Sequence, residues 1–310
     1  MLKGRVINSN GGNYIILDSE GKKIPAKPSG RLRYVSVDKE SKFNTNMNKL
    51  STKTSTARLK VSPKVGDEVI YEMGDIAYIT EVLERKNSLI RPDISNVDQI
   101  VLVFAAKEPS FSYYLLDMFL VNIISEGITP LIIISKTDLL TDDEYVELNL
   151  GMDYYRNIGY QVLFVNSLNL KDRNKILSLL KGKISVLSGQ TGAGKSTLIN
   201  AIIPGFSLNT NEISKALGRG KHTTRETNLY EYKDCLIGDT PGFSKFDLKE
   251  INAIDLRNYF VEFNKYDCKF NDCLHLSNTK GCLVCEAVKK GEIKESRYNN
   301  YIKMLNEIRR

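Results

Sequence analysis

The chain has 310 residues, of which 42% are hydrophobic, 44 are lysine or arginine and 37 are aspartate or glutamate. This length suits two or three domains, and no apolar run approaches the length of a transmembrane helix, so we expect a soluble protein without a membrane partner. The net charge of +7 is compatible with a polyanionic partner but does not establish one.

The first 92 residues carry short alternating apolar runs, at 5–7, 14–17, 69–71 and 77–79, separated by turn residues such as Asn10-Gly11-Gly12. This pattern is typical of a five-stranded β-barrel of the oligonucleotide-binding type (OB-fold), so we predict an RNA-binding domain at 1–92. The polar, lysine-rich segment from Asp38 to Lys60 is either a long mobile loop that reaches a phosphate backbone or a surface insertion without a partner.

Buried strands alternating with helices begin at Gln99, with a strand at 99–104 and a helix at 111–125, and predict a central α/β domain at 93–247. The strand Leu131 to Ile134 is followed by Ser135-Lys136-Thr137-Asp138. Asp138 can accept hydrogen bonds from guanine N1–H and its 2-amino group, a donor pair that adenine lacks, and the Lys136 stem would lie along the base. The alternative is a solvated Lys/Asp pair after a strand. A weaker second base contact is predicted at Asn166 and Ser167, after the strand at 161–164.

A phosphate-binding loop spans Gly189 to Ser196, between an apolar strand at 184–188 and a helix at 196–203 that Pro204 ends. Backbone N–H groups and the helix N-terminus would cradle phosphates, Lys195 would reach the outer phosphates, and the Ser196 hydroxyl would ligate Mg²⁺. The alternative is a glycine-rich turn without a ligand. The nucleotide-binding residues predicted here are Ser188, Gly189, Gln190, Thr191, Gly192, Ala193, Gly194, Lys195, Ser196 and Thr197.

Two further motifs follow the phosphate loop. The polar stretch 218–224 is the natural first switch, and either Thr223 or Thr224 would complete the Mg²⁺ shell; the sequence does not choose, and our working assignment places Thr224 on the metal and Thr223 at the nucleotide. The alternative is a flexible basic loop. Asp239-Thr240-Pro241-Gly242 follows an apolar run, so Asp239 would hold Mg²⁺ through water and the Gly242 N–H would meet the γ-phosphate.

The order of these motifs is rotated relative to an ordinary GTPase, because the base-reading motif precedes the phosphate loop. This order predicts a circularly permuted GTPase. Phe243 stands where Ras-like enzymes have a water-orienting glutamine, so hydrolysis needs help from His222, from an arginine such as Arg219 or Arg225, or from a partner. The predicted catalytic residues are His222, Lys195 and Thr224.

Four of the five cysteines lie close together near the C-terminus, with one of the two histidines. Three thiolates and one imidazole make the tetrahedral shell of a structural zinc ion, and the best ligand set is Cys268, Cys273, His275 and Cys282. Cys285 is an alternative to Cys282, because the two are about one helical turn apart. Disulfides are not favoured, since there is no secretory signal and a cytosolic enzyme keeps its thiols reduced. We therefore predict a zinc-binding, mainly helical domain at 248–310, with a helical tail at 286–310, and we interpret Cys235 as a small buried hydrophobe.

The barrel-like N-terminus, the permuted order, Gly218-Arg219-Gly220-Lys221-His222-Thr223-Thr224, Asp239-Thr240-Pro241-Gly242-Phe243 and the Cys/Cys/His/Cys pattern together resemble the RsgA family of ribosome small-subunit-dependent GTPases. The resemblance spans nearly the whole chain, including 91–99 at the domain junction and Arg297-Tyr298 in the tail. Two departures are Ser135, where the family has Asn or Thr, and a gap between His275 and Cys282 that is one residue longer.

The resemblance implies GTP hydrolysis stimulated by the small ribosomal subunit late in its maturation, with release of the protein after hydrolysis. It implies GTP or GDP, Mg²⁺ and one structural Zn²⁺ as cofactors, the small subunit and its rRNA as partners, no DNA, and a cytoplasmic monomer. Two other function classes would leave different marks. A metabolic kinase would need an acceptor pocket and a catalytic base, which we do not find, and an RNA-binding scaffold with a regulatory GTP site would show no ribosome-stimulated turnover.

Overall fold

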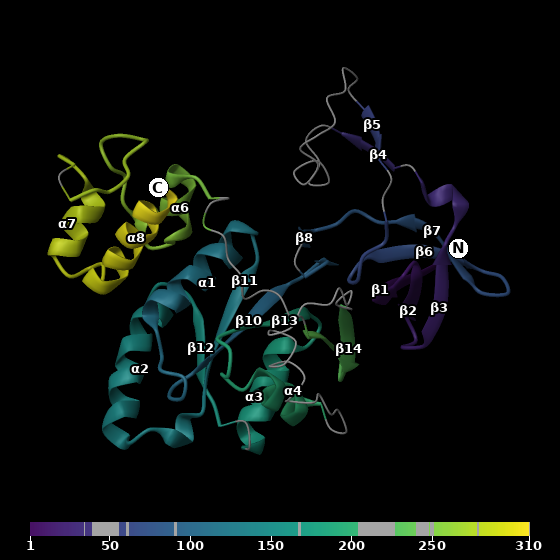
Figure 1. The fold of residues 1–310 in the computed structure, drawn as a ribbon, viewed down its shortest axis with the longest axis horizontal. Coiled ribbons are helices and arrows are strands. Elements are labelled where there is room, and N and C mark those ends of the chain that lie inside the picture. The colour runs from purple at the N-terminus through teal and green to yellow at the C-terminus, as the bar shows by residue number, and fades with distance from the viewer. Residues whose placement is uncertain are drawn as a thin grey trace, which may run out of the picture. The chain divides into compact units, whose positions relative to one another are not determined.

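The computed structural model of the chain describes residues 1–33, 35–38, 56–59, 62–89, 92–166, 169–203, 227–239, 248, 251–277 and 279–309. The chain forms two compact units (Figure 1). One contains 1–99, 177–187 and 209–242, and the other contains 100–176, 188–208 and 243–310. The domain boundaries at 92 and 247 stay predictions.

The N-terminal part of the first unit is a closed five-stranded barrel, drawn in purple and blue in Figure 1. The order β1-β2-β3-β7-β6 closes because β1 also pairs with β6, and β3 and β7 are parallel. Alternate side chains point inward and form a core that includes Val6, Ile16 and Ile79. This confirms the predicted OB-fold. Its strands are β1 (Leu2–Asn10), β2 (Asn13–Asp18), β3 (Lys23–Pro28), β6 (Glu68–Met73) and β7 (Ala77–Val82).

The predicted loop from Asp38 to Lys60 was placed too broadly. After the 3₁₀ turn η1 (Gly30–Arg33), β4 (Val35–Asp38) pairs antiparallel with β5 (Thr56–Leu59), so residues at both ends of the segment are strand. Antiparallel pairing satisfies their backbone polar groups, a contribution that lysine-rich composition does not reveal. Residues 39–55 and 60 lie outside the described residues.

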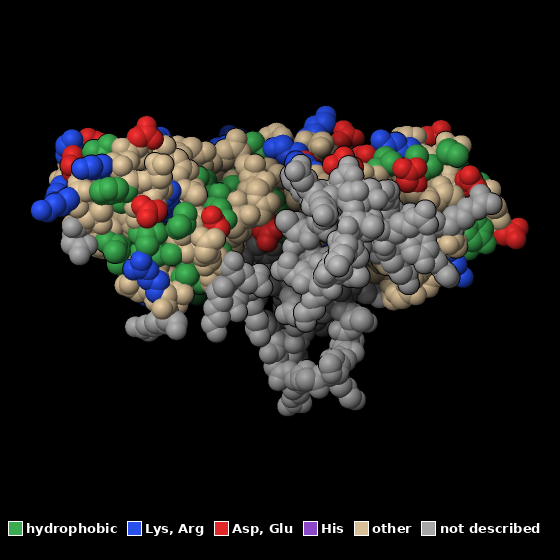
Figure 2. Space-filling model, turned by 90° about the horizontal axis from the view of Figure 1, so that it is seen from above, with side chains coloured by type: hydrophobic (Ala, Val, Ile, Leu, Met, Phe, Trp, Pro, Cys, Tyr) green, Lys and Arg blue, Asp and Glu red, His purple; other side chains and the backbone are tan. Residues whose placement is uncertain are grey.

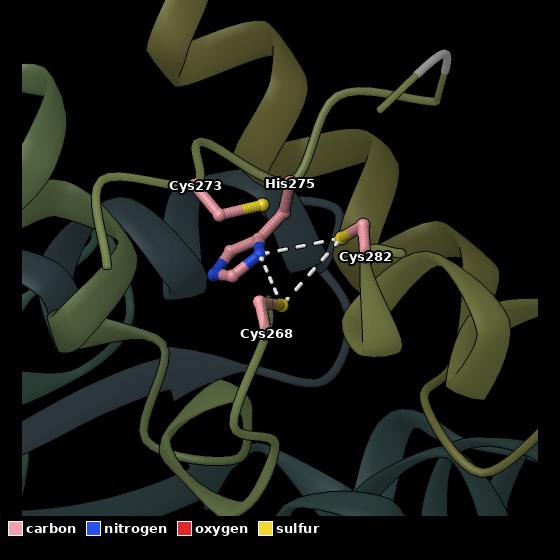
Figure 3. Close-up of side chains that lie close together, drawn as sticks. All are labelled: Cys268, Cys273, His275 and Cys282. Atoms are coloured by element: carbon pink, nitrogen blue, oxygen red, sulfur yellow. Dashed lines mark hydrogen bonds between the residues drawn. The ribbon is translucent and has the colours of Figure 1, made fainter. Parts of the chain in front are cut away.

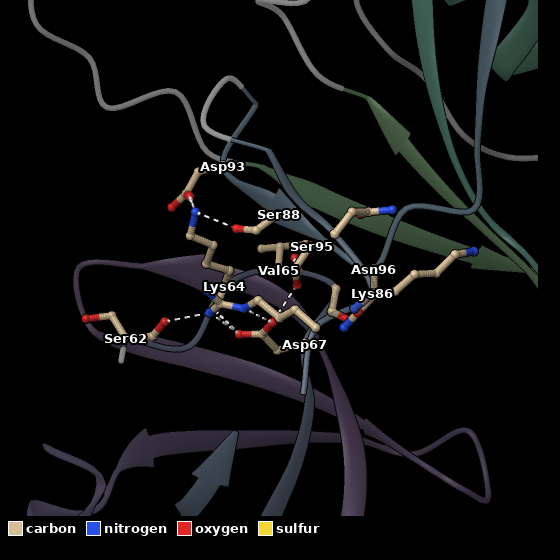
Figure 4. Close-up of polar contacts among 12 residues, drawn as sticks. Ser62, Lys64, Val65, Asp67, Lys86, Ser88, Asp93, Ser95 and Asn96 are labelled. Atoms are coloured by element: carbon tan, nitrogen blue, oxygen red, sulfur yellow. Dashed lines mark hydrogen bonds and ion pairs between the residues drawn. The ribbon is translucent and has the colours of Figure 1, made fainter. Parts of the chain in front are cut away.

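A buried ion pair connects the barrel to residues 85–95, which form the junction that follows it in the chain (Figure 4). Asp67 accepts hydrogen bonds from Arg85 Nε and Nη2, both at 2.7 Å, and from the Ser95 hydroxyl. Ser95 belongs to the short pair β8 (Ser88–Leu89) and β9 (Ile94–Ser95). Because Asp67 is fully buried, these donors replace the water that its carboxylate loses and fix the junction against the barrel.

Three more strands lie wholly or mostly in the first unit and come from the predicted α/β domain: β13 (Ile184–Gly189), β14 (Asn228–Tyr232) and β15 (Cys235–Asp239). β13 and β15 run parallel with Leu187 opposite Asp239, whereas β14 is antiparallel to β15 and also pairs with β1 through Asn228 and Asn8. Cys235 is buried inside β15, which confirms its interpretation as a small hydrophobe.

The second unit holds the strands that follow the junction, in the order β12-β11-β10, and β11 and β12 are parallel. Every residue of β10 is buried, as its continuous apolar run predicts. The predicted helix at 111–125 begins two residues later because the Ser112 hydroxyl caps it. These elements are β10 (Gln99–Ala105), α1 (Tyr113–Ser125), β11 (Thr129–Ser135), η2 (Thr137–Leu139), α2 (Asp142–Asn157), β12 (Gln161–Phe164), α3 (Leu170–Leu180) and α4 (Lys195–Ile202).

The C-terminal helices, green to yellow in Figure 1, pack around an aromatic core that contains Phe260, Phe263 and Tyr301. The predicted helical tail at 286–310 contains the end of α7 and all of α8, which are separated at Gly291, whose φ of +76° ends a helix. The elements are α6 (Ala253–Tyr259), η4 (Phe263–Lys265), α7 (Leu283–Lys289) and α8 (Glu295–Ile308). Within the described part of the chain, no helix is both long and apolar enough to span a bilayer.

On the face shown in Figure 2, lysine and arginine side chains are interspersed with aspartate and glutamate over the described residues. The net charge of +7 is therefore not gathered into one basic patch on the described part of this face.

Candidate functional site

The phosphate loop lies between β13 and α4, in the strand, loop and helix arrangement that the sequence predicts. Gly189, Gly192 and Gly194 have φ values of +121°, +80° and +85°, a region that favours glycine. Lys195 Nζ donates to the carbonyl oxygens of Gly189 at 2.9 Å and Gln190 at 2.7 Å. These bonds hold the ammonium across the loop, whose backbone N–H groups begin the helix, so the segment has the form of an anion site.

The base-reading segment meets this loop. The Ser135 hydroxyl, at the buried end of β11, donates to the carbonyl oxygen of Ala193 at 2.6 Å and lies 3.2 Å from that of Phe104. The Ser135 side chain is thus long enough to reach the phosphate loop, although it is shorter than the Asn or Thr that the family has at this position. The structure brings together two motifs that are separated by more than 50 residues in the chain.

Lys136 and Asp138 follow in a turn that exposes the carboxylate. Lys136 has a left-handed backbone with φ of +57°, and Thr137 and Asp138 continue into η2. Asp138, the predicted guanine contact, is exposed. The Lys136 ammonium donates to the carbonyl oxygen of Glu108.

The loop between β10 and α1 is a third segment beside the predicted nucleotide site. The sequence analysis missed it. Gln190 Nε2 donates to the carbonyl oxygen of Ser110 at 3.0 Å, and Pro109 lies beside Gly192. This loop therefore touches both the phosphate loop and, through Glu108, Lys136. Its contacts are made by backbone carbonyls, which leave no residue-type signal, and only its position at the carboxyl end of a strand could have indicated it.

The remaining predicted nucleotide residues are partly described. The Asn166 N–H donates to Asp172 Oδ2 at 3.0 Å, which fixes the segment after β12. The backbone of Asp239 ends β15, at the carboxyl edge where the prediction placed it, but its side chain is outside the described part of the chain. The other predicted residues outside the described ranges are Ser167, His222, Thr223, Thr224 and Gly242.

A second site lies among the C-terminal helices (Figure 3). The ligand atoms of Cys268, Cys273, His275 and Cys282 all lie within 4.8 Å of one another, and Figure 3 shows the four side chains pointing toward one another. A tetrahedral zinc ion with bonds of about 2.3 Å to sulfur and about 2.0 Å to nitrogen needs separations of roughly 3.8 Å between sulfurs and 3.5 Å between sulfur and nitrogen.

Three of the separations in the structure match these values. The two sulfurs of Cys268 and Cys282 are 3.9 Å apart, and His275 Nδ1 lies 3.5 Å and 3.4 Å from them. Burial lowers the pKa of His275 to about 4, and the nearby Arg257 charge acts in the same direction. The imidazole is therefore neutral at pH 7, which a metal ligand requires, and the four residues fit a zinc ion.

Tyrosine hydroxyls outside the cluster donate hydrogen bonds to its backbone and hold it in place. The Tyr298 and Tyr301 hydroxyls of α8 donate to the carbonyl oxygens of His275 and Leu274, at 2.7 Å and 2.8 Å. His275 has a left-handed backbone with φ of +51°, which these bonds help to maintain. The ligand loop is thus built onto the last helix of the chain.

The structure distinguishes Cys282 from Cys285 as the fourth zinc ligand, a choice that the sequence left open. Cys282 precedes α7, and its sulfur accepts a hydrogen bond from the Cys285 N–H at 3.4 Å. The Cys285 sulfur is turned away and lies 3.3 Å and 3.4 Å from the carbonyl oxygens of His275 and Leu276. Because the Cys282 sulfur faces the other ligand atoms and the Cys285 sulfur faces backbone carbonyls, Cys282 has the geometry of a ligand and Cys285 has not.

Comparisons with known proteins identify the family of the chain. The sequence model of the RsgA GTPase family matches residues 82–249. A protein of Geobacillus sp. (strain WCH70) named small ribosomal subunit biogenesis GTPase RsgA is 41% identical over 313 aligned residues, covering 100% of this chain and 98% of that protein. The protein of the same name from Shouchella clausii is 46% identical over 253 residues, covering 80% of this chain and 86% of that protein.

Solved structures are similar over nearly the whole chain. The crystal structure of YloQ, described as a circularly permuted GTPase, has a TM-score of 0.80 at 35% identity and covers 100% of this chain and 95% of that chain. The structure of YjeQ from Thermotoga maritima has a TM-score of 0.77 at 32% identity, with 99% and 98% covered. The chain therefore belongs to the RsgA family of circularly permuted GTPases.

Proposed function

We propose that this chain is a GTPase of small ribosomal subunit biogenesis that hydrolyses GTP to GDP and phosphate. The observation that carries the proposal is the hydrogen bond from Ser135 to Ala193, which joins the base-reading segment to the phosphate loop. Family membership and the names of the relatives support the cellular role.

The nucleotide would be held by the two motifs just described, with Asp138 on the guanine edge and the loop from Gly189 to Ser196 on the phosphates. Lys195, already fixed over the loop, would stabilise charge on the outer phosphates as the terminal bond breaks. Mg²⁺ would be ligated by Ser196 and a switch threonine, Thr223 or Thr224, with Asp239 acting through water; when bound, it neutralises charge on the phosphate oxygens. Zn²⁺ would be held by Cys268, Cys273, His275 and Cys282 as a structural ion.

Help with hydrolysis would come from the small subunit. Phe243 has no group that can orient water, so we propose that His222, placed by the bound subunit, does so, and that the protein leaves the subunit after hydrolysis. A cytoplasmic monomer is part of the same proposal.

The barrel is proposed to contact rRNA through side chains on β3 and β7. Lys27 and Tyr78 are paired neighbours on these parallel strands, and both are exposed. An exposed aromatic ring beside a cation suits base stacking next to a phosphate, which needs no sequence reading. Replacing Tyr78 with Ala should weaken RNA binding and leave GTP binding unchanged.

The decisive experiment is GTP hydrolysis by the purified protein with and without purified small ribosomal subunits, with large subunits and ATP as controls. We expect stimulation by small subunits alone, loss of stimulation in His222→Ala with nucleotide affinity kept, and no turnover in Lys195→Ala. GTP and RNA binding without stimulated turnover would instead identify an RNA-binding scaffold with a regulatory GTP site. Equal turnover of ATP would contradict the assignment of Asp138.

A further inference from the structure

Helix α1 carries one charged residue, Asp117, in a mostly apolar and aromatic sequence, and residues of two other helices donate hydrogen bonds to it. Asp117 Oδ1 accepts from Arg297 Nη1 and, at 2.7 Å, from the Tyr155 hydroxyl, while Oδ2 accepts from Asn300 at 2.6 Å. Tyr155 belongs to α2, and Arg297 and Asn300 belong to α8. One carboxylate therefore fixes α1 against both helices.

Arg297 is the centre of this network. Its Nε donates to Glu262 Oε1 at 2.7 Å, and its guanidinium lies 4.6 Å from the centre of the Phe260 ring. The exposed fractions of Arg297, Asp117 and Glu262 are 1%, 0% and 3%. Burial raises the pKa of Asp117, and its cationic and hydrogen-bonding partners oppose that rise.

A buried network of this kind is a poor source of stability. Removing three charged groups from water costs about as much as their attraction returns, and apolar residues of the same volume often stabilise as well or better. The network instead fixes the position of the Asp117 carboxylate, because its hydrogen bonds come from fixed directions. Hydrophobic packing would not hold the side chain in one place in this way. We therefore expect the position of Asp117 to affect a segment that is connected to α1.

The N-terminal end of α1 leads directly into the nucleotide site. Asp117 lies in the second turn, and Ser112 caps the helix by accepting from the Leu115 N–H at 3.3 Å. Just before the cap, the carbonyl oxygens of Glu108 and Ser110 receive the side chains of Lys136 and Gln190. A shift of α1 along its axis would move both carbonyls relative to the base-reading and phosphate motifs.

We propose that Asp117 and Arg297 are positioning residues for the guanine-nucleotide site, acting through α1 and the loop at 106–111. The inference rests on the proposed function in that the ligand is a guanine nucleotide. The C-terminal helix α8, which also holds the zinc-ligand loop through Tyr298 and Tyr301, thereby sets how tightly the nucleotide is held. Coupling is reciprocal, so a partner that moves α8 would change nucleotide affinity by the same factor by which nucleotide changes the partner's affinity.

The test uses the full-length, zinc-loaded protein and a fluorescent GDP analogue whose dissociation rate is measured by chase with unlabelled GDP. Arg297→Lys keeps the charge but loses the forked geometry, and we expect dissociation about tenfold faster, the equivalent of one charge-assisted hydrogen bond. Asp117→Asn should have a similar effect, and the double variant should be no faster than Asp117→Asn alone, because Arg297 acts through Asp117.

The matched control is Leu305→Ala, a change to a fully buried residue on the same helix that leaves a cavity and removes none of the hydrogen bonds to Asp117. It should lower the thermal midpoint at least as much as Arg297→Lys and leave GDP dissociation within about twofold. If Arg297→Lys does not fold, Asn300→Leu removes only the bond to Oδ2 and should speed dissociation about threefold. Zinc content, measured in parallel, should stay at one ion per chain.

Unchanged GDP dissociation in folded Arg297→Lys or Asn300→Leu would overturn the proposal. Equal acceleration in Leu305→Ala would also overturn it, because loss of stability alone would then explain the effect. Failure of the wild-type protein to bind GDP would contradict the proposed function and not the positioning role. The two failures are therefore distinguishable.

Discussion

The hydroxyl of Ser135 donates a 2.6 Å hydrogen bond to the carbonyl oxygen of Ala193 and so connects the end of β11 to the phosphate loop. Ser135 is buried, and Ala193 is completely buried, so water cannot replace this bond if it is lost. The contact makes the placement of the base-reading segment depend on the shape of the phosphate loop. Base and phosphate recognition should therefore change together when it is removed.

Ser135→Ala should weaken GDP and GTP binding alike, by about 1 kcal/mol or roughly fivefold in Kd, because the Ala193 carbonyl is left without its donor. Ser135→Thr is the control, since it keeps the hydroxyl. Isothermal titration with both nucleotides measures the effect. Equal affinities in Ser135→Ala and the wild type would show that the bond does not position the base-reading segment.

Two glycines of the phosphate loop should respond very differently to alanine. A Cβ at Gly189 would lie 2.2 Å from the carbonyl oxygen of Val103, whereas a Cβ at Gly194 would meet nothing within 4 Å. We expect Gly189→Ala to reduce the free energy of unfolding by about 3 kcal/mol or more, and Gly194→Ala to cost about 1 kcal/mol for its left-handed backbone. Urea unfolding without nucleotide tests this, and equal losses would contradict it.

Asp138→Asn should exchange guanine for xanthine as the preferred base. The side-chain amide can no longer accept both guanine donors, but its NH₂ group can donate to the carbonyl that xanthine has at C2. GTP affinity should fall about 100-fold, the loss of two hydrogen bonds to a charged acceptor, and XTP affinity should rise. Competition binding with GTP, XTP and ATP measures this, and a variant that keeps its preference for GTP would remove Asp138 from base recognition.

Cys282→Ser should lose zinc and Cys285→Ser should keep it. The Cys282 sulfur lies 3.4 Å from His275 Nδ1, whereas Cys285 bonds to backbone carbonyls, an interaction that a serine hydroxyl can replace. Zinc per chain, measured on protein purified without added metal, should be close to one for Cys285→Ser and well below one for Cys282→Ser. The reverse pattern would make Cys285 the fourth ligand.

Much of the architecture could be predicted because its signals are local. The alternation in 5–7 and 14–17, the apolar run of β10 and the glycine-rich loop before α4 each report a strand or a loop from neighbouring residues. Errors occurred where pairing or capping with other residues decides the boundary. Thr56–Leu59 is a strand because β4 lies beside it, and α1 begins at Tyr113 because of the Ser112 cap.

The candidate site divides in the same way. The sequence predicts roles for Asp138, Lys195 and the zinc-ligand types, since each belongs to a short motif whose chemistry follows from residue type and spacing. It missed Asp117, although one acid in the apolar helix at 113–125 was a usable signal. It gave no role to Arg297, whose partners lie 35 and 180 residues away.

By itself, then, the sequence determined the rotated order of the motifs and the chemistry that each can perform, because these depend on residue type and local spacing. The tertiary structure alone decided that Cys282 and not Cys285 faces the other ligands, that Ser135 reaches the phosphate loop, and that Gly189 has no room for a side chain while Gly194 has. Each of these depends on the direction of a side chain or on an atom from a distant segment, and spacing along the chain sets neither.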